Sequence, residues 1–181
     1  MDLSAPRHAV LTGAPGAGKT TLLDAAAAAG IRTSPEVARE LLKTPGGMSL
    51  RAQDPLGFAE AMAEAHIKEH ERHAGQPCLV VFDRGLPDVV GFLDVSGLAV
   101  PAAIDHACRS WRYCGPVLRA PAWAEIYAQD SERIQDWDQA VASDQAVTAA
   151  WRRYGYELID LPLVRVEDRL SFMKAKVYPA A

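Results

Sequence analysis

The segment that most constrains the fold of this chain is Gly-Ala-Pro-Gly-Ala-Gly-Lys-Thr at residues 13–20. It matches at every position the pattern Gly, four residues, Gly-Lys and then Ser or Thr, which builds a phosphate-binding P-loop between a strand and a helix. Its glycines let the backbone curl so that successive N–H groups point at a phosphate, and the N-terminus of the following helix adds partial positive charge. The chain is therefore predicted to hold a nucleotide by its phosphates on a strand–loop–helix unit.

The residues of this loop have expected roles toward a nucleoside triphosphate and Mg²⁺. Lys19 is expected to bridge the β- and γ-phosphates and to act in catalysis, and Thr20 to ligate Mg²⁺. ATP is favoured as the nucleotide, because the sequence contains no Asn/Thr-Lys-x-Asp string of the kind that reads guanine. The predicted nucleotide-binding residues are Gly13, Ala14, Pro15, Gly16, Ala17, Gly18, Lys19, Thr20 and Thr21.

Short apolar runs alternate with longer helical patterns along the chain. Runs of strand length occupy residues 8–12, 31–34, 78–82, 115–118 and 156–161. Helical patterns occupy residues 20–29, 35–43 and 56–73, whereas residues 44–55, with two prolines and two glycines, are predicted to form a loop. This alternation predicts an α/β, doubly wound, three-layer fold built on a mostly parallel sheet.

Composition limits the partners and the compartment. A chain of 181 residues with 49% hydrophobic and 23% charged residues is predicted to be one globular domain over residues 1–181. The net charge of -4 disfavours a nucleic-acid partner, and the absence of about 18 consecutive apolar residues disfavours a membrane. Three cysteines without a Cys-x-x-Cys spacing favour reduced thiols in the cytoplasm. Association of two copies as a homodimer is left open.

A second acidic motif follows the third apolar run. The string Leu-Val-Val-Phe-Asp at residues 79–83 has the form of a Walker B strand, and Asp83 is predicted to hold Mg²⁺ during catalysis. The alternative is an aspartate that caps the helix starting near Pro87. Arg84 is predicted to clamp an acceptor phosphate or to neutralise charge in the transition state, with a surface salt bridge as the alternative.

The end of the second apolar run supplies candidates for the acceptor side. Ligands in such sheets bind at the carboxyl ends of the strands, which places Glu36 at the crevice. Glu36 is predicted to accept a proton from an attacking hydroxyl, and Arg39, on the same side of the helix, to hold the acceptor. A glutamate favoured in a first helical turn by the helix dipole is the alternative.

Residues 120–137 are predicted to contain a lid, because this aromatic- and arginine-bearing stretch follows the fourth run. Arg133 is the candidate that a closing lid brings onto the transferring phosphoryl group, although an arginine beside acids often pairs with them in solvent. His66, His70 and His73 stand at helical spacing but lack the glutamate of the zinc-protease pattern, so a solvated polar face is predicted for them.

These motifs together resemble a family. The segments 13–21, 35–40, 82–88, 124–133 and 155–159 are similar to the small bacterial predicted-ATPase family, an AAA-type P-loop group related to the ATP-binding kinase domain of ribosylnicotinamide kinase regulators. The resemblance implies a kinase-type sheet of five strands in the order 2-3-1-4-5. It also implies that residues 161–163 border the adenine, and it supports the roles of Asp83, Arg84, Glu36 and Arg39. The expected fourth strand is less apolar than this resemblance requires, at Gly-Pro-Val-Leu-Arg-Ala (115–120).

Two functions are consistent with these motifs and with the family resemblance. The first is a small-molecule kinase that transfers the γ-phosphoryl group of ATP to a hydroxyl or phosphate of a nucleoside-like or other small acceptor. The second is a regulatory P-loop ATPase, a switch whose hydrolysis acts on a protein partner. A kinase requires an acceptor pocket near Glu36 and Arg39, whereas a switch requires slow hydrolysis that responds to the partner.

Overall fold

The computed structural model describes residues 7–75, 78–127 and 136–178. Its sheet has five strands, all parallel, in the order β2-β3-β1-β4-β5. The strands are β1 (Arg7–Gly13), β2 (Arg32–Thr33), β3 (Leu79–Asp83), β4 (Val117–Ala120) and β5 (Leu158–Asp160). The predicted fold class and strand order are confirmed, and β1, which leads into the P-loop, is the central strand.

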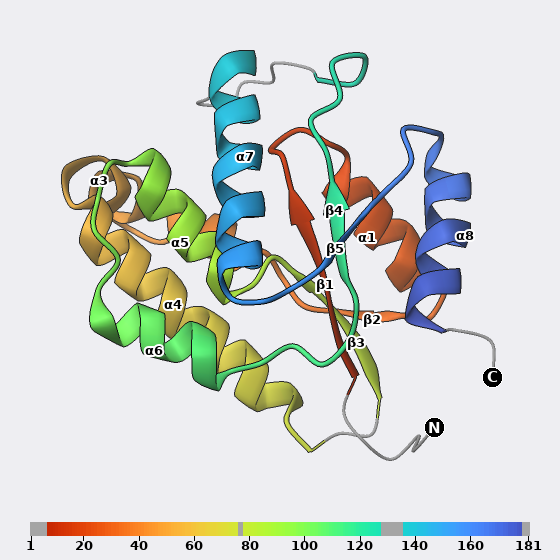
Figure 1. Cartoon of the computed structure of the whole chain (residues 1–181), viewed down its shortest axis with the longest axis horizontal. Helices are drawn as coiled ribbons and strands as arrows, with labels where there is room; N and C mark the ends of the chain where they lie inside the picture. The colour runs from red at the N-terminus through yellow and green to blue at the C-terminus, as the bar shows by residue number, and fades with distance from the viewer. Residues whose placement is uncertain (1–6, 76–77, 128–135, 179–181) are drawn as a thin grey trace.

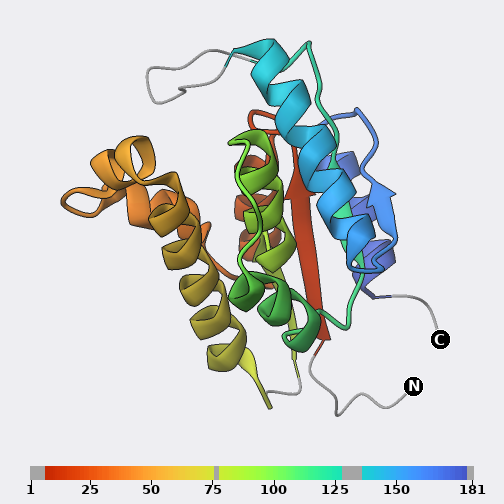
Figure 2. The ribbon, with the colours of Figure 1, turned by 60° about the vertical axis from the view of Figure 1, so that its left-hand side comes forward.

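Helices cover both faces of the sheet (Figures 1 and 2). α1 and α8 lie on one face and α5 and α7 on the other, with α4 and α6 packed outside α5. The helices are α1 (Lys19–Ala28), α2 (Val37–Lys43), α3 (Gly47–Gln53), α4 (Pro55–His73), α5 (Leu86–Val95), α6 (Ala102–Ser110), α7 (Trp137–Arg153) and α8 (Val166–Val177). None in the described part of the chain combines the length and apolar character needed to cross a membrane.

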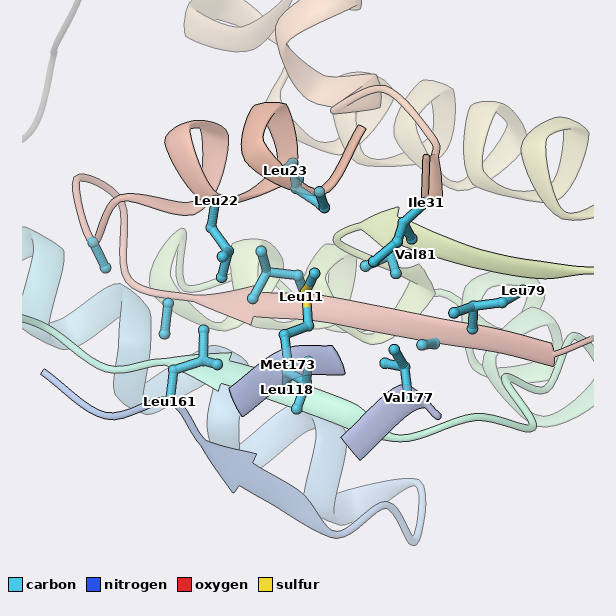
Figure 3. Packing of buried hydrophobic residues seen from close by; sticks show 14 of the residues in the cluster. Leu11, Leu22, Leu23, Ile31, Leu79, Val81, Leu118, Leu161, Met173 and Val177 are labelled. Atoms are coloured by element: carbon cyan, nitrogen blue, oxygen red, sulfur yellow. The ribbon is translucent and has the colours of Figure 1, made fainter. Parts of the chain in front are cut away.

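Strand β1 is buried on both faces, as expected for a parallel sheet covered by helices on both sides. Successive side chains along it point to opposite faces. Leu11 lies in a cluster with Leu22 of α1 and Met173 of α8, which Figure 3 shows around the strand. Val10, one residue before, packs on the opposite face with Trp151 of α7. Burying a leucine fully stabilises a fold by about 1.5–3 kcal/mol, so these two clusters anchor the strand that precedes the P-loop.

Two expectations about local structure are corrected. Residues 44–55 were predicted to form a loop but contain helix α3, because Gly46, with a φ of 85°, turns the chain, and Leu50 then packs on the α4–α5 cluster. The fourth strand lies at Val117–Ala120 rather than 115–118. Its polar residue, Arg119, is accommodated because the guanidinium pairs with Asp144 of α7 at 2.8 Å and with Asp160 of β5 at 3.0 Å.

The predicted solvated face of α4 is also wrong. His66 is only 3% exposed, and the ring of His70 makes an edge contact with His8 of β1 at 4.6 Å between centroids. His70 and His73 turn inward because the C-terminal end of α4 packs beside β1 and β3, where Phe82 contacts the rings of His8, His70 and His73. Among the described residues, no group of three or more His, Cys, Asp and Glu side chains is arranged to hold a metal ion.

Candidate nucleotide and acceptor site

The P-loop joins β1 to α1, as the sequence predicts. Gly13, Gly16 and Gly18 have φ angles of 114°, 75° and 75°, which side-chain-bearing residues rarely adopt. Gly13 is required for a second reason, since a Cβ placed there would lie 2.2 Å from the carbonyl oxygen of Ala120 in β4. The loop can therefore curl closely against the sheet only with glycine at this position.

Lys19 lies inside the curl of the loop and is 7% exposed. Its ammonium donates hydrogen bonds to the carbonyl oxygens of Gly13 at 3.3 Å and Ala14 at 2.5 Å. Burial, followed by repulsion from the Arg84 guanidinium, lowers the pKa of Lys19 to about 8. Phosphate oxygens are stronger acceptors than these neutral carbonyls, so a bound polyphosphate would favour the charged ammonium that the predicted role requires.

Asp83 ends β3 beside the P-loop and is 6% exposed. Its Oδ1 has no hydrogen-bond partner among the described residues. Burial, followed by repulsion from Glu36, raises the pKa of Asp83 to about 6. A buried carboxylate with a free oxygen is poorly solvated by the protein alone and is suited to a cation.

Thr20 and Asp83 line one cavity of about 400 Å³ that also contains Glu36 and Arg39. Hydroxyl and carboxylate oxygens are the hard ligands that Mg²⁺ prefers, so these two residues fit the predicted metal role. Mg²⁺ held there would offset the charge of the nucleotide phosphates. The structure thus brings together the P-loop, the metal candidates and the acceptor-side candidates; their ligand roles stay predictions.

Arg84 occupies a strained position at the end of β3. Its φ of 69° is the only positive value of a non-glycine residue in the described part of the chain. The side chain is 15% exposed and donates to Glu36 Oε1 at 3.3 Å, to Asp88 Oδ1 at 2.9 Å and to the Gly13 carbonyl at 3.2 Å. Although burial opposes it, attraction to Asp88 and Glu36 raises the pKa of Arg84 above its ordinary value. The guanidinium is therefore already engaged by carboxylates, and it borders the phosphate loop rather than the solvent.

Glu36 is the N-cap residue of α2 and makes two ion pairs. Its Oε1 faces Arg84, and its Oε2 lies 3.4 Å from Nε of Arg39, whose side chain is 51% exposed. Burial raises the pKa of Glu36, but Arg84, Lys19 and Arg39 outweigh it and hold the pKa below its ordinary value. A carboxylate of this kind is ionised at neutral pH and can orient a hydroxyl group, although it is a weaker base than a free glutamate.

Asp88, on the first turn of α5, joins the site to the helices behind it. Its Oδ1 accepts from Thr12 Oγ1 at 2.6 Å and from Arg84, while Oδ2 accepts from Gly85 N at 3.0 Å and from Trp151 Nε1 at 2.9 Å. The helix-capping role that was the alternative for Asp83 thus belongs to Asp88. Sequence reasoning assigned Asp88 no role, and the only signal was its place in the segment 82–88 that carries the family resemblance.

The predicted lid can be followed only in part. Arg133 falls in residues 128–135, outside the described residues. The stretch that follows β4 approaches the P-loop, since a Cβ placed on Gly18 would lie 3.3 Å from Cδ1 of Ile126. α7 then begins at Trp137, whose ring contacts that of Tyr127 at 5.3 Å between centroids. Tyr127, within the predicted lid, and Trp137, at its C-terminal end, thus lie close together, and the role of Arg133 stays a prediction.

Comparisons with known proteins agree with this architecture. A family model described as an AAA domain matches residues 8–169, which confirms the resemblance drawn from the motifs. Deoxyadenosine kinase from M. mycoides superposes with a TM-score of 0.71 at 14% identity over 96% of this chain and 100% of that chain. A NadR protein in complex with NR has a TM-score of 0.72 at 15% identity over 95% of this chain and 52% of that chain.

A third solved structure, thymidylate kinase from Candida albicans, has a TM-score of 0.66 at 10% identity over 93% of this chain and 89% of that chain. No curated protein sequence gives a match. Identities this low show a shared fold, so the roles of individual residues here depend on the geometry described above.

Replacing Asp83 with asparagine is expected to stabilise the nucleotide-free protein while removing Mg²⁺-dependent activity. Because the pKa of Asp83 is raised from 3.8 to about 6, this carboxyl favours the fold at acid pH and loses that contribution as the pH rises between those values. At pH 7, Asp83→Asn should therefore raise the free energy of unfolding by about 1–3 kcal/mol. Urea unfolding measures this, with Asp24→Asn, at an exposed position on the same cavity, as the matched control. A lower stability of Asp83→Asn would contradict the assignment.

Replacing Asp88 with asparagine is expected to lower the free energy of unfolding by about 2–4 kcal/mol. An asparagine has one acceptor oxygen, so the donors to either Oδ1 or Oδ2 would lose their acceptor, and the buried Arg84 would lose a counter-charge. Urea unfolding again gives the free energy. Asp94→Asn, an exposed position on the same helix, should change it by less than about 0.5 kcal/mol. Equal effects of the two substitutions would show that the hydrogen bonds of Asp88 do not support the site.

Proposed function

We propose that this chain, which belongs to the AAA domain family, is a Mg²⁺-dependent kinase that transfers the γ-phosphoryl group of ATP to a hydroxyl of a small, nucleoside-like acceptor. The observation that carries the proposal is one cavity that adjoins the P-loop and combines Thr20, Asp83, Glu36 and Arg39. Solved structures of similar fold support a nucleotide ligand, since deoxyadenosine kinase has been seen with dATP and NadR protein with AMP-PNP.

The proposed reaction uses positioning more than covalent chemistry. The P-loop amides and Lys19 hold the β- and γ-phosphates, while Thr20 and Asp83 would hold the metal. The acceptor oxygen forms a bond to the γ-phosphorus as the bond to the β-phosphate oxygen breaks and ADP leaves. The hydroxyl proton passes to the Glu36 carboxylate, whose two ion pairs keep it ionised and pointing into the cavity.

The charge of the cavity favours a hydroxyl acceptor without a phosphate. Among the described residues that line it, Arg39 is the one cation, against the carboxylates of Asp24, Glu36, Glu40 and Asp83. Arg84, the other predicted acceptor contact, is held by Glu36 and Asp88 and has little charge to offer a second anion. An uncharged or cationic alcohol would meet less repulsion here than a nucleoside monophosphate.

Incubation with MgATP and a panel of nucleosides, each paired with its monophosphate, is expected to give a phosphorylated nucleoside-type acceptor and little product from the monophosphate. Mass spectrometry of each acceptor and ADP release measure the reaction. Lys19→Ala is the control and should lower turnover by at least about 100-fold, because it removes the cation that bridges the phosphates. Slow ADP release that is the same with every acceptor would instead favour the regulatory ATPase.

Glu36→Gln is expected to lower kcat for phosphoryl transfer by about 100-fold while leaving the affinity for ATP within about threefold, because the amide cannot take the hydroxyl proton. Steady-state kinetics with a saturating acceptor separate the two effects. Glu64→Gln, on the exposed face of α4, is the matched control and should change neither constant. A wild-type kcat for Glu36→Gln would remove Glu36 from the reaction.

A further inference from the structure

A second arginine lies at the P-loop and has no place in the proposed reaction. Arg169 belongs to α8, which packs beside α1 on one face of the sheet (Figure 1). Its residue is 3% exposed, and Nη1 donates a hydrogen bond to the carbonyl oxygen of Ala17 at 2.9 Å. A Cβ placed on Gly18 would lie 3.0 Å from the same nitrogen. The guanidinium of α8 therefore touches the backbone of the P-loop at Ala17 and Gly18.

Among the residues that the structure describes, no carboxylate balances the charge of Arg169. No ion pair of Arg169 occurs within residues 7–75, 78–127 and 136–178, and its Nε and Nη2 have no hydrogen-bond partner there. The Trp123 ring, 5.7 Å away, gives only a weak cation–π contact. Arg84, by contrast, also lies beside the loop but forms ion pairs with two carboxylates, Glu36 and Asp88. A buried cation without a partner is costly, so an anion that the described part of the nucleotide-free chain does not supply would stabilise this guanidinium.

The surrounding backbone also disfavours a cation. α1 begins at Lys19 and α8 at Val166, so Arg169 lies close to two helix N-termini, where partial positive charge accumulates. The acids of the first turn of α8, Glu167 and Asp168, are exposed to solvent. Electrostatically, the place is unfavourable for a guanidinium and favourable for a polyanion held by the adjacent amides.

We propose that Arg169 is a positioning residue for the nucleotide, which holds the Ala17 carbonyl outward and supplies an unbalanced positive charge behind the phosphate loop. The bound polyphosphate balances that charge from the opposite side of the loop. The inference rests on the nucleotide site of the proposed function, but not on the identity of the acceptor. It assigns to α8 a direct part in the affinity for the nucleotide.

Isothermal titration with AMP-PNP and Mg²⁺ tests the proposal, because binding is then measured without turnover. Arg169→Met, which removes the charge and the hydrogen bond, should raise the Kd by about tenfold or more. Arg169→Gln keeps a donor for Ala17 without the charge and should lose nearly as much, whereas Arg169→Lys keeps the charge and should stay within about threefold of the wild type. Arg165→Met removes the same charge from an exposed position one turn earlier and should leave the Kd unchanged.

The melting temperature of the nucleotide-free variants separates this role from a structural one. The unbalanced charge of Arg169 destabilises the nucleotide-free protein. The melting temperatures of Arg169→Met and Arg169→Gln should therefore be no lower than that of the wild type. A lower melting temperature with an unchanged Kd would overturn the proposal, and so would an equal loss of affinity in Arg165→Met. If Arg169→Met does not fold, Arg169→Gln decides the question alone.

Failure of the kinase proposal would look different. A chain that binds AMP-PNP in the predicted order of variants but phosphorylates no acceptor would retain the role of Arg169 and lose the kinase. A wild-type chain that does not bind AMP-PNP with Mg²⁺ would overturn the role of Arg169, since no nucleotide would then complete the site.

Discussion

Asp88 makes the hydrogen bonds on which the geometry of the site depends. Its carboxylate joins Thr12 of the central strand, the strained Arg84 and Trp151 of α7. Each of these groups is buried or nearly so, and each needs a partner that water does not supply. Because one side chain serves them all, the end of β3, the start of α5 and the P-loop strand hold a common position. The position of the cavity that contains Asp83 and Glu36 therefore depends on these hydrogen bonds.

Charges around the P-loop fall into two groups with different consequences. The side chains of Arg84, Glu36 and Asp88 form ion pairs with one another. They therefore shape the site and need no ligand to balance their charges. Lys19, Asp83 and Arg169 are not balanced in this way among the described residues. The ammonium of Lys19 donates only to backbone carbonyls, while Asp83 has an oxygen, and Arg169 has nitrogens, without a hydrogen-bond partner. In the proposed function, MgATP would supply the charges that this second group lacks, and its binding would offset the cost of burying these residues.

Much of the fold could be predicted because its signals are local. The P-loop pattern, the apolar runs and the helical stretches each occupy a short window, and the strand order followed from the family resemblance. Prediction failed where distant contacts decide the outcome. Helix α3 forms because Leu50 meets the α4–α5 cluster, His66 is buried by the packing of α4, and Arg119 fits in β4 because Asp144 and Asp160 reach it from other elements.

The sequence by itself determined that a phosphate-binding loop follows the central strand, and it singled out Lys19, Thr20, Asp83, Glu36 and Arg39, because these stand beside recognisable local patterns. Only the tertiary structure decided which side chains balance one another. Arg84 and Arg169 are both arginines near acidic residues in the sequence, yet one is paired and the other touches the P-loop from a helix at the far end of the chain. Burial and charge pairing are properties of the packed chain, and no window of residues contains them.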